Sequence, residues 1–213
     1  MTALTKPRMN VDEFLAWAAD QPGRHELFSG EVYPISPEAI GHAKLKGALY
    51  TALLAAVHKS GRPYYVLPDG ATVRVDDATA YEPDALVYCG QELAAAAIEV
   101  PEPVIVVEVL SPWSRQIDLA VKLAGYFLLP SLAHYLIVDP NRSLILHHSR
   151  AGDAILTRIV TEGAIILDPP GMELALADVY AGLADESDSS PADARRAQGG
   201  KVCENFTVRC GRR

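Results

Sequence analysis

The run PVIVVEVL at residues 103–110 constrains the fold of this chain more than any other stretch. Valine and isoleucine favour β-strands, and here they follow one another almost without interruption. A strand that is apolar on both faces is typical of the centre of a sheet whose two faces are both covered. We therefore expect a central sheet with helices packed against its faces.

Helices and strands alternate along the rest of the chain. Apolar residues recur at helical spacing over residues 10–20, 41–59 and 114–128, and Asn10 with Glu13 forms a potential capping box in the first segment. Short β-forming runs predict a hairpin at 24–37, strands at 64–68, 71–77, 83–89, 103–110, 134–140 and 143–149, and a β ribbon from 154–160 and 164–170. This order predicts an α/β (α+β) fold.

The 213 residues suffice for one domain with a substantial core and are too few for two comfortable ones. After Leu183 the sequence becomes polar and poor in large apolar residues, which is typical of disorder. We therefore expect one domain over residues 8–183 and a disordered tail over residues 184–213. Three widely spaced cysteines indicate neither a disulfide framework nor a zinc site.

Composition restricts the location and the partners of the chain. The first twenty residues do not have the pattern of a signal peptide, and no run of 18 apolar residues could span a membrane, so a cytoplasmic protein is expected. The net charge of −8 disfavours general binding to polyanions. Any nucleic-acid role would therefore need a local basic surface or metal ions to offset the phosphates.

Two carboxylates lie at or inside β-forming runs. Glu108 interrupts the run 103–110, on the same side of the strand as Val104 and Val106, where an unpaired carboxylate would cost roughly several kcal/mol. Asp84 follows Pro83, where it either caps a turn or carries chemistry. Such acids persist when they pair with a cation, bind a metal or face a cleft at a strand end.

Lys122 supplies the third member of this set. On the helix expected over 114–128 it lies at the edge of the apolar face, one turn from Asp118 and Tyr126. It either forms a surface pair with Asp118 or directs its ammonium toward the strand carboxylates. Two carboxylates can hold a divalent cation, and a lysine beside them can stabilise developing negative charge.

Several segments, in order along the chain, resemble the Uma2-like proteins, which are described as restriction endonucleases of the PD-(D/E)XK superfamily. The segments are RHELFSGEVYPISP, GHAKLKGALYTALL, EPDALVY, VVEVLSPWSRQIDLAVKLAGY and AHYLIVDP. The resemblance covers nearly all of residues 10–180 and is most specific over 106–140. It implies a restriction-endonuclease-like core, a central mixed β-sheet flanked by helices, with Mg²⁺ (or Mn²⁺) at its edge.

The resemblance also implies roles for individual residues. Asp84 and Glu108 match the two acids of the superfamily motif and would be metal ligands, with the carbonyl of Val109 as a further ligand. Glu26 matches an early glutamate that often completes the metal site. The superfamily lysine would fall at position 110, which here is Leu110, so Lys122 is its expected substitute.

Three basic residues near these segments are candidate contacts to nucleic acid. His42 begins a helix and is either a metal, phosphate or proton-transfer residue or a polar residue of the helix start. Lys44, together with Lys46, either contacts backbone phosphates or belongs to a solvated face. Arg115 is either a phosphate contact or a cation at a helix start.

These observations predict a Mg²⁺-dependent endonuclease that hydrolyses nucleic acid, with DNA as the expected substrate and a homodimer as the expected assembly. Glu26, Asp84, Glu108 and Lys122 would form the catalytic site. The alternative from another class is a non-catalytic nucleic-acid-binding or dimerisation module that kept the nuclease fold. A third reading, in which the acids and the lysine form only a buried ion network, is weaker because hydrophobic replacements are often as stable.

Overall fold

A computed structural model describes residues 8–111 and 117–183. Its centre is a six-stranded sheet with the strand order β10-β9-β8-β7-β6-β3. The strands are β3 (Tyr64–Pro68), β6 (Ala85–Cys89), β7 (Pro103–Val109), β8 (His134–Val138), β9 (Ile145–Ala151) and β10 (Ala154–Val160). β7 and β8 run parallel and the other neighbours antiparallel, so the sheet is mixed. Every residue of β7 is buried, which confirms the expected central strand.

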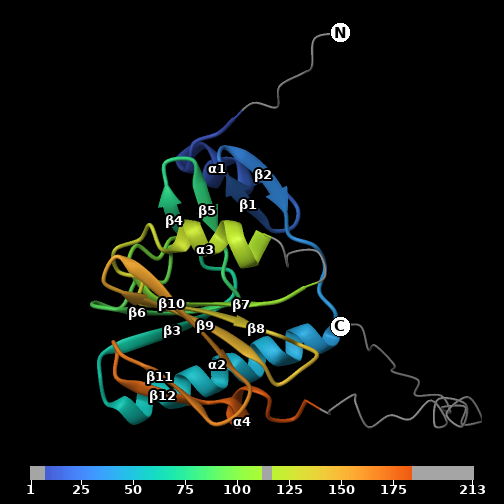
Figure 1. The fold of residues 1–213 in the computed structure, drawn as a ribbon. Helices are drawn as coiled ribbons and strands as arrows, with labels where there is room; N and C mark the ends of the chain where they lie inside the picture. Colours follow the sequence, from blue (N-terminus) through green and yellow to red (C-terminus); the bar gives the residue numbers. More distant parts are fainter. Residues whose placement is uncertain (1–7, 112–116, 184–213) are drawn as a thin grey trace, which may run out of the picture. The chain divides into compact units, whose positions relative to one another are not determined.

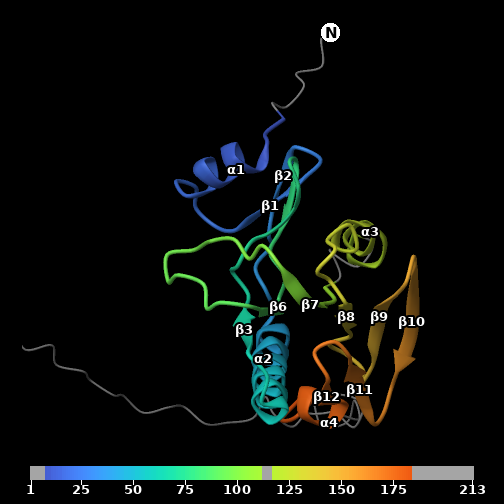
Figure 2. The ribbon, with the colours of Figure 1, turned by 90° about the vertical axis from the view of Figure 1, so that its left-hand side faces the viewer.

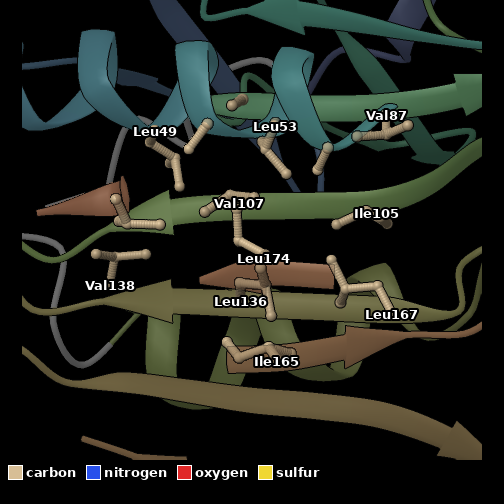
Figure 3. Close-up of a cluster of buried hydrophobic side chains, with 14 of the residues drawn as sticks. Leu49, Leu53, Val87, Ile105, Val107, Leu136, Val138, Ile165, Leu167 and Leu174 are labelled. Atoms are coloured by element: carbon tan, nitrogen blue, oxygen red, sulfur yellow. The ribbon is translucent and has the colours of Figure 1, made fainter. Parts of the chain in front are cut away.

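One face of this sheet is covered by α2 (Ile40–Ser60). The buried side chains of α2 include Leu45, Leu49 and Leu53, which recur at helical spacing. Figure 3 shows Leu49 and Leu53 beside residues of the sheet such as Val107. β11 (Ala164–Leu167), β12 (Met172–Ala175) and α4 (Leu176–Val179) contribute to the same apolar cluster.

The opposite face is covered by the residues that precede β8. The described part of the helix expected over 114–128 is a π-helical turn, η1 (Ile117–Lys122), followed by α3 (Leu123–Tyr126). Tyr126 is fully buried against this face, and Leu123 and Phe127 pack against the same cluster. Figures 1 and 2 show α3 and α2 on opposite sides of the six-stranded sheet, so the sheet is flanked by helices as expected.

A second, four-stranded sheet has the order β2-β1-β5-β4. Its strands are β1 (His25–Phe28), β2 (Glu31–Pro34), β4 (Val73–Asp76) and β5 (Thr79–Tyr81). The hairpin of β1 and β2 was expected, whereas β5 was not. α1 (Val11–Ala18) begins at the expected capping box of Asn10 and Glu13 and packs on this sheet. Figures 1 and 2 show this sheet and α1 on the side of the six-stranded sheet that carries α3.

The expected β ribbon over 154–160 and 164–170 is wrong. β10 pairs with β9, because only Gly152 and Asp153 separate the two strands and such a short connection favours a hairpin. β11 pairs with β12, a strand that was not expected. None of the described helices is long and apolar enough to cross a membrane. The domain boundary at residue 183 stays a prediction, since residues 184–213 lie outside the described part.

Candidate functional site

Asp84 lies immediately before β6 and is hydrogen-bonded to the end of the central strand β7. Its backbone N–H donates to the carbonyl of Val107 at 3.0 Å, which continues the pairing of the two strands. Its carboxylate Oδ2 accepts a hydrogen bond from the backbone N–H of Val109 at 2.7 Å. The carboxylate therefore lies at the peptide that follows Glu108.

Glu108 lies on β7 and is 4 % exposed. Its Oε1 accepts hydrogen bonds from Nζ of Lys122 and from the hydroxyl of Tyr126, both at 2.9 Å. Burial, together with the charge of Glu108, raises the pKa of Tyr126 well above its usual value, so this hydroxyl is a donor at neutral pH. The cost of burying the carboxylate is thus offset by an ammonium and by a phenol.

Glu26 shares the ammonium of Lys122. Nζ of Lys122 lies 2.9 Å from Oε1 of Glu26, and the same oxygen accepts the backbone N–H of Glu82 at 2.9 Å. Lys122 is 5 % exposed, and its ammonium also lies over the ring of Tyr81, 5.5 Å from the ring centroid. The structure therefore brings Glu26, Glu108 and Lys122 together in one cluster, which we call the Lys122 cluster.

Asp84 belongs to a second ion cluster that is centred on Lys46. Nζ of Lys46 lies 2.9 Å from Oδ1 of Asp84, 2.6 Å from Oδ2 of Asp69 and 2.5 Å from Oε1 of Glu38. Burial alone would lower the pKa of Lys46, but the charges and hydrogen bonds of the carboxylates, with Asp84 first, raise it. These residues, with Tyr50 and others, line a pocket of about 250 Å³. We call this group the Lys46 cluster.

Arg24 connects the two clusters. Its Nη1 donates to Oδ2 of Asp69 and its Nε donates to Oε2 of Glu82, both at 2.7 Å. The backbone of Glu82 in turn donates to Glu26. Asp84 is thus linked to the Lys122 cluster through side chains as well as through the backbone of β7.

The three candidate contacts to nucleic acid have different surroundings. Nε2 of His42 donates to the carbonyl of Val109 at 2.9 Å, and Nδ1 lies 3.3 Å from Oε2 of Glu38. Lys44 is exposed on α2. Arg115 lies outside the described residues. The reading of Lys46 as part of a solvated face is wrong, because its side chain is buried among carboxylates.

The oxygen atoms at this edge of the sheet suit magnesium. Asp84, Glu108 and the carbonyl of Val109 offer hard oxygen ligands, and Mg²⁺ is usually held by one or two carboxylates with several waters. Each of the two carboxylates already forms an ion pair, Asp84 with Lys46 and Glu108 with Lys122. Among residues 8–111 and 117–183, no three histidine, cysteine or acidic side chains are grouped so as to hold a metal ion. Asp84, Glu108 and the carbonyl of Val109 are thus oxygen donors of the kind that Mg²⁺ takes, and they contact Lys46, Lys122 and His42 in this structure.

Sequence reasoning missed several residues of the two clusters, namely Arg24, Glu38, Asp69 and Tyr126. For Lys46 the sequence predicted either a contact to backbone phosphates or a place on a solvated face. It follows His42 by one helical turn and lies between Leu45 and Leu49 on the apolar stripe of α2. A lysine on a buried stripe needs anionic partners, so this spacing was the available signal.

Comparison with known proteins agrees with the fold. A crystal structure described as "a putative nuclease belonging to DUF820" from Anabaena variabilis matches with a TM-score of 0.63. The match covers 81% of this chain and 97% of that chain at 17% sequence identity. The expected restriction-endonuclease-like fold class, with its central mixed sheet flanked by helices, is confirmed by this likeness.

Similarity in sequence is also extensive. An uncharacterized protein of Synechocystis sp. is 26% identical over 181 residues, which cover 84% of this chain and 94% of that relative. The model of the Uma2 family, described as "Putative restriction endonuclease", matches residues 11–179. Because this match spans most of the chain, the protein belongs to the Uma2 family.

Proposed function

We propose that this protein is a Mg²⁺-dependent endonuclease that hydrolyses the phosphodiester bonds of nucleic acid, with DNA as the expected substrate. Membership of the Uma2 family and the fold of the Anabaena variabilis relative support a nuclease-like function. The observation that carries the proposal is the buried ammonium of Lys122, which lies 2.9 Å from both Glu26 and Glu108. A lysine held by carboxylates beside further oxygen ligands suits phosphodiester hydrolysis.

Asp84 and Glu108 would hold the cation, Mg²⁺ or Mn²⁺, with the carbonyl of Val109 as a further ligand. Such a cation would supply polarisation of a phosphoryl oxygen and a lowered pKa for a coordinated water. The backbone N–H of Val109 fixes Oδ2 of Asp84, and Tyr126 fixes Oε1 of Glu108. These two hydrogen bonds orient the carboxylates before any ligand arrives, which lowers the cost of binding.

Lys122 would stabilise the negative charge that develops on the attacking oxygen and on the phosphoryl group. Its ammonium is held between Glu26, Glu108 and the ring of Tyr81, so little reorganisation is needed during the reaction. Glu26 would position this ammonium and an attacking water. Water would form the new bond to phosphorus as the bond to the leaving oxygen breaks, and we expect a 5′-phosphate, as in the superfamily.

A second candidate function is a non-catalytic nucleic-acid-binding or dimerisation module that kept the nuclease fold. The net charge of −8 favours it, as does Leu110 at the position where the superfamily has its lysine. A homodimer would suit the nuclease, because cutting both strands of a duplex usually needs two sites.

Cleavage assays separate the two functions. Wild-type protein should nick or cut at least one substrate in a panel of plasmid DNA, linear duplex, single-stranded DNA and RNA when Mg²⁺ or Mn²⁺ is added. Lys122→Met should lower the rate by about a hundredfold or more. The control is Lys59→Met, which changes an exposed lysine at the far end of α2. Equal cleavage by wild type and Lys122→Met would reject the proposed role, and the absence of cleavage across the panel would favour the module.

A further inference from the structure

Lys46 contacts the proposed metal ligand Asp84 from the side of the sheet opposite Lys122. It lies on α2, whereas Lys122 lies at the end of η1, and these elements pack on different faces of the six-stranded sheet. Only 7 % of Lys46 is exposed. The proposed metal ligands Asp84 and Glu108 therefore pair with different buried lysines.

Three carboxylates converge on the single ammonium of Lys46. Oxygens of Glu38, Asp69 and Asp84 lie 2.5, 2.6 and 2.9 Å from Nζ. Arg24 provides a second cation for Asp69, and His42 contacts the other oxygen of Glu38. Among these three acids, Asp84 is the one that the Uma2 resemblance assigns to the metal.

Both oxygens of Asp84 are occupied. Oδ2 accepts the backbone N–H of Val109, and Oδ1 pairs with Lys46. A divalent cation that binds Asp84 must therefore share Oδ1 with an ammonium or replace it. Two cations near one carboxylate also repel each other, and the repulsion is large where little water screens it.

From this geometry we infer that Lys46 is a positioning residue that competes with the divalent cation for Asp84. In the metal-free protein its ammonium keeps Asp84 in place and offsets part of the charge of the three carboxylates. When the cation binds, Lys46 keeps its contacts with Glu38 and Asp69 and yields Oδ1 of Asp84. The inference rests on the proposed function, because it takes Asp84 as a metal ligand.

Lys46 could either hold Asp84 in place or compete with the cation for it, and the two roles predict opposite changes in metal affinity when Lys46 is removed. If Lys46 only held Asp84 in place, its removal would loosen the carboxylate and weaken metal binding. If Lys46 competes, its removal leaves Glu38, Asp69 and Asp84 with one positive charge fewer among them, so the divalent cation binds more tightly. Metal affinity therefore tests the inference without any measurement of activity.

Isothermal titration calorimetry with Mg²⁺ and Mn²⁺ should compare the wild type with Lys46→Met, a substitution that keeps the length of the side chain. We expect Lys46→Met to bind the cation about tenfold more tightly, because a neighbouring positive charge has been removed. Lys59→Met removes the same charge from an exposed position of α2 and should leave the affinity unchanged. Adding Asp84→Ala to Lys46→Met should abolish the gain.

The possible results separate this inference from the proposed function. Equal or weaker binding by Lys46→Met, when the wild type binds metal through Asp84, overturns the inference and leaves the proposed function standing. No saturable binding by either protein at millimolar metal overturns both. If Lys46→Met does not fold, the same prediction applies to Lys46→Gln, which keeps a polar group.

A measurement on the wild type keeps the inference testable without any variant. The side-chain ammonium of Lys46 should give a slowly exchanging ¹H–¹⁵N signal in NMR spectra, because it is buried and held by carboxylates. Saturating Mg²⁺ should shift this signal and speed its exchange with water. A signal that stays unchanged while metal binding saturates would overturn the inference.

Discussion

Glu108 is the residue on which the site depends, and its surroundings explain how a carboxylate persists on the central strand. Lys122 and Tyr126 contact the same oxygen, Oε1. Moving a carboxylate out of water costs roughly several kcal/mol, and both contacts offset part of that cost. The interactions that stabilise the buried charge thus also fix its orientation.

Two neighbouring tyrosines provide a test of this reasoning. The hydroxyl of Tyr126 donates to Glu108, whereas the buried hydroxyl of Tyr81 has no hydrogen-bond partner among the described residues. Tyr126→Phe should therefore lower the free energy of unfolding by about 2 kcal/mol, while Tyr81→Phe should leave it unchanged or raise it by up to about 1 kcal/mol. Urea denaturation measures both. A larger loss in Tyr81→Phe than in Tyr126→Phe would contradict this assignment.

A buried pair of histidines makes stability depend on pH. Nδ1 of His134 lies 2.9 Å from Nε2 of His147, and Nε2 of His134 donates to the carbonyl of Pro169 at 2.9 Å. Burial, together with the nearby positive charges of His134 and Arg158, lowers the pKa of His147 to about 4. Burial also lowers the pKa of His134 and of His148.

Because the pKa of His147 is about 4 in the folded state and near 6.5 when unfolded, the unfolded chain binds more protons between those values. Stability is therefore full above pH 6.5 and falls as the pH drops toward 4. Between pH 7.5 and 5.5 the free energy of unfolding should fall by about 1 kcal/mol from His147. Urea denaturation at both pH values should show this loss reduced in His147→Gln and kept in His58→Gln, an exposed control. An unreduced loss in His147→Gln would show that other groups cause it.

At the scale of elements, the short helix α3, which directly follows Lys122, packs closely on β5. A Cβ added at Gly125 would lie 3.0 Å from Cε2 and 3.1 Å from the hydroxyl oxygen of Tyr81. The glycine thus allows the ring of Tyr81 to approach α3, and the same ring lies under the ammonium of Lys122. Backbone packing and the position of the lysine are therefore coupled.

Gly125→Ala should force Tyr81 or α3 to move by a few tenths of an ångström. We expect a loss of about 1–3 kcal/mol in the free energy of unfolding, as for other overpacked sites, although alanine favours helices. Thermal and urea denaturation measure this change. Gly47→Ala is the control, because a Cβ there meets no atom within 4 Å and should stabilise α2. Equal effects of the two substitutions would contradict the close packing.

The elements that sequence alone predicted are those with a strong local pattern. The capping box of Asn10 and Glu13, the apolar stripe of α2 and the valine-rich β7 each determine structure within one segment. The predictions that were wrong or incomplete concern the pairing of strands from different segments. β5 is only three residues long, and the partners of β10 and β11 depend on turns and on packing that their own residues do not encode.

At the scale of the whole molecule, the sequence predicted the four acidic and basic residues of the candidate site but only part of their arrangement. Glu26, Glu108 and Lys122 come from β1, β7 and η1 and lie together as expected. Asp84 joins them through the backbone of β7 and through Arg24, while its own charge pairs with Lys46. The spacing of residues in the sequence indicates which of them are buried. Which basic residue pairs with which acid depends on the three-dimensional fold.

The charges of the two clusters determine what an approaching polyanion would meet. The acids of these clusters outnumber the basic side chains Arg24, Lys46 and Lys122, so a phosphate would meet net negative charge there. A bound divalent cation would lower that repulsion.

The most direct test of the central claim is the anomalous diffraction of crystals soaked in Mn²⁺. The account predicts one strong peak about 2.1 Å from oxygens of both Asp84 and Glu108, at the end of β7 where the carbonyl of Val109 lies. No peak at this position under saturating Mn²⁺, with the ammonium groups of Lys46 and Lys122 still on the two carboxylates, would contradict it.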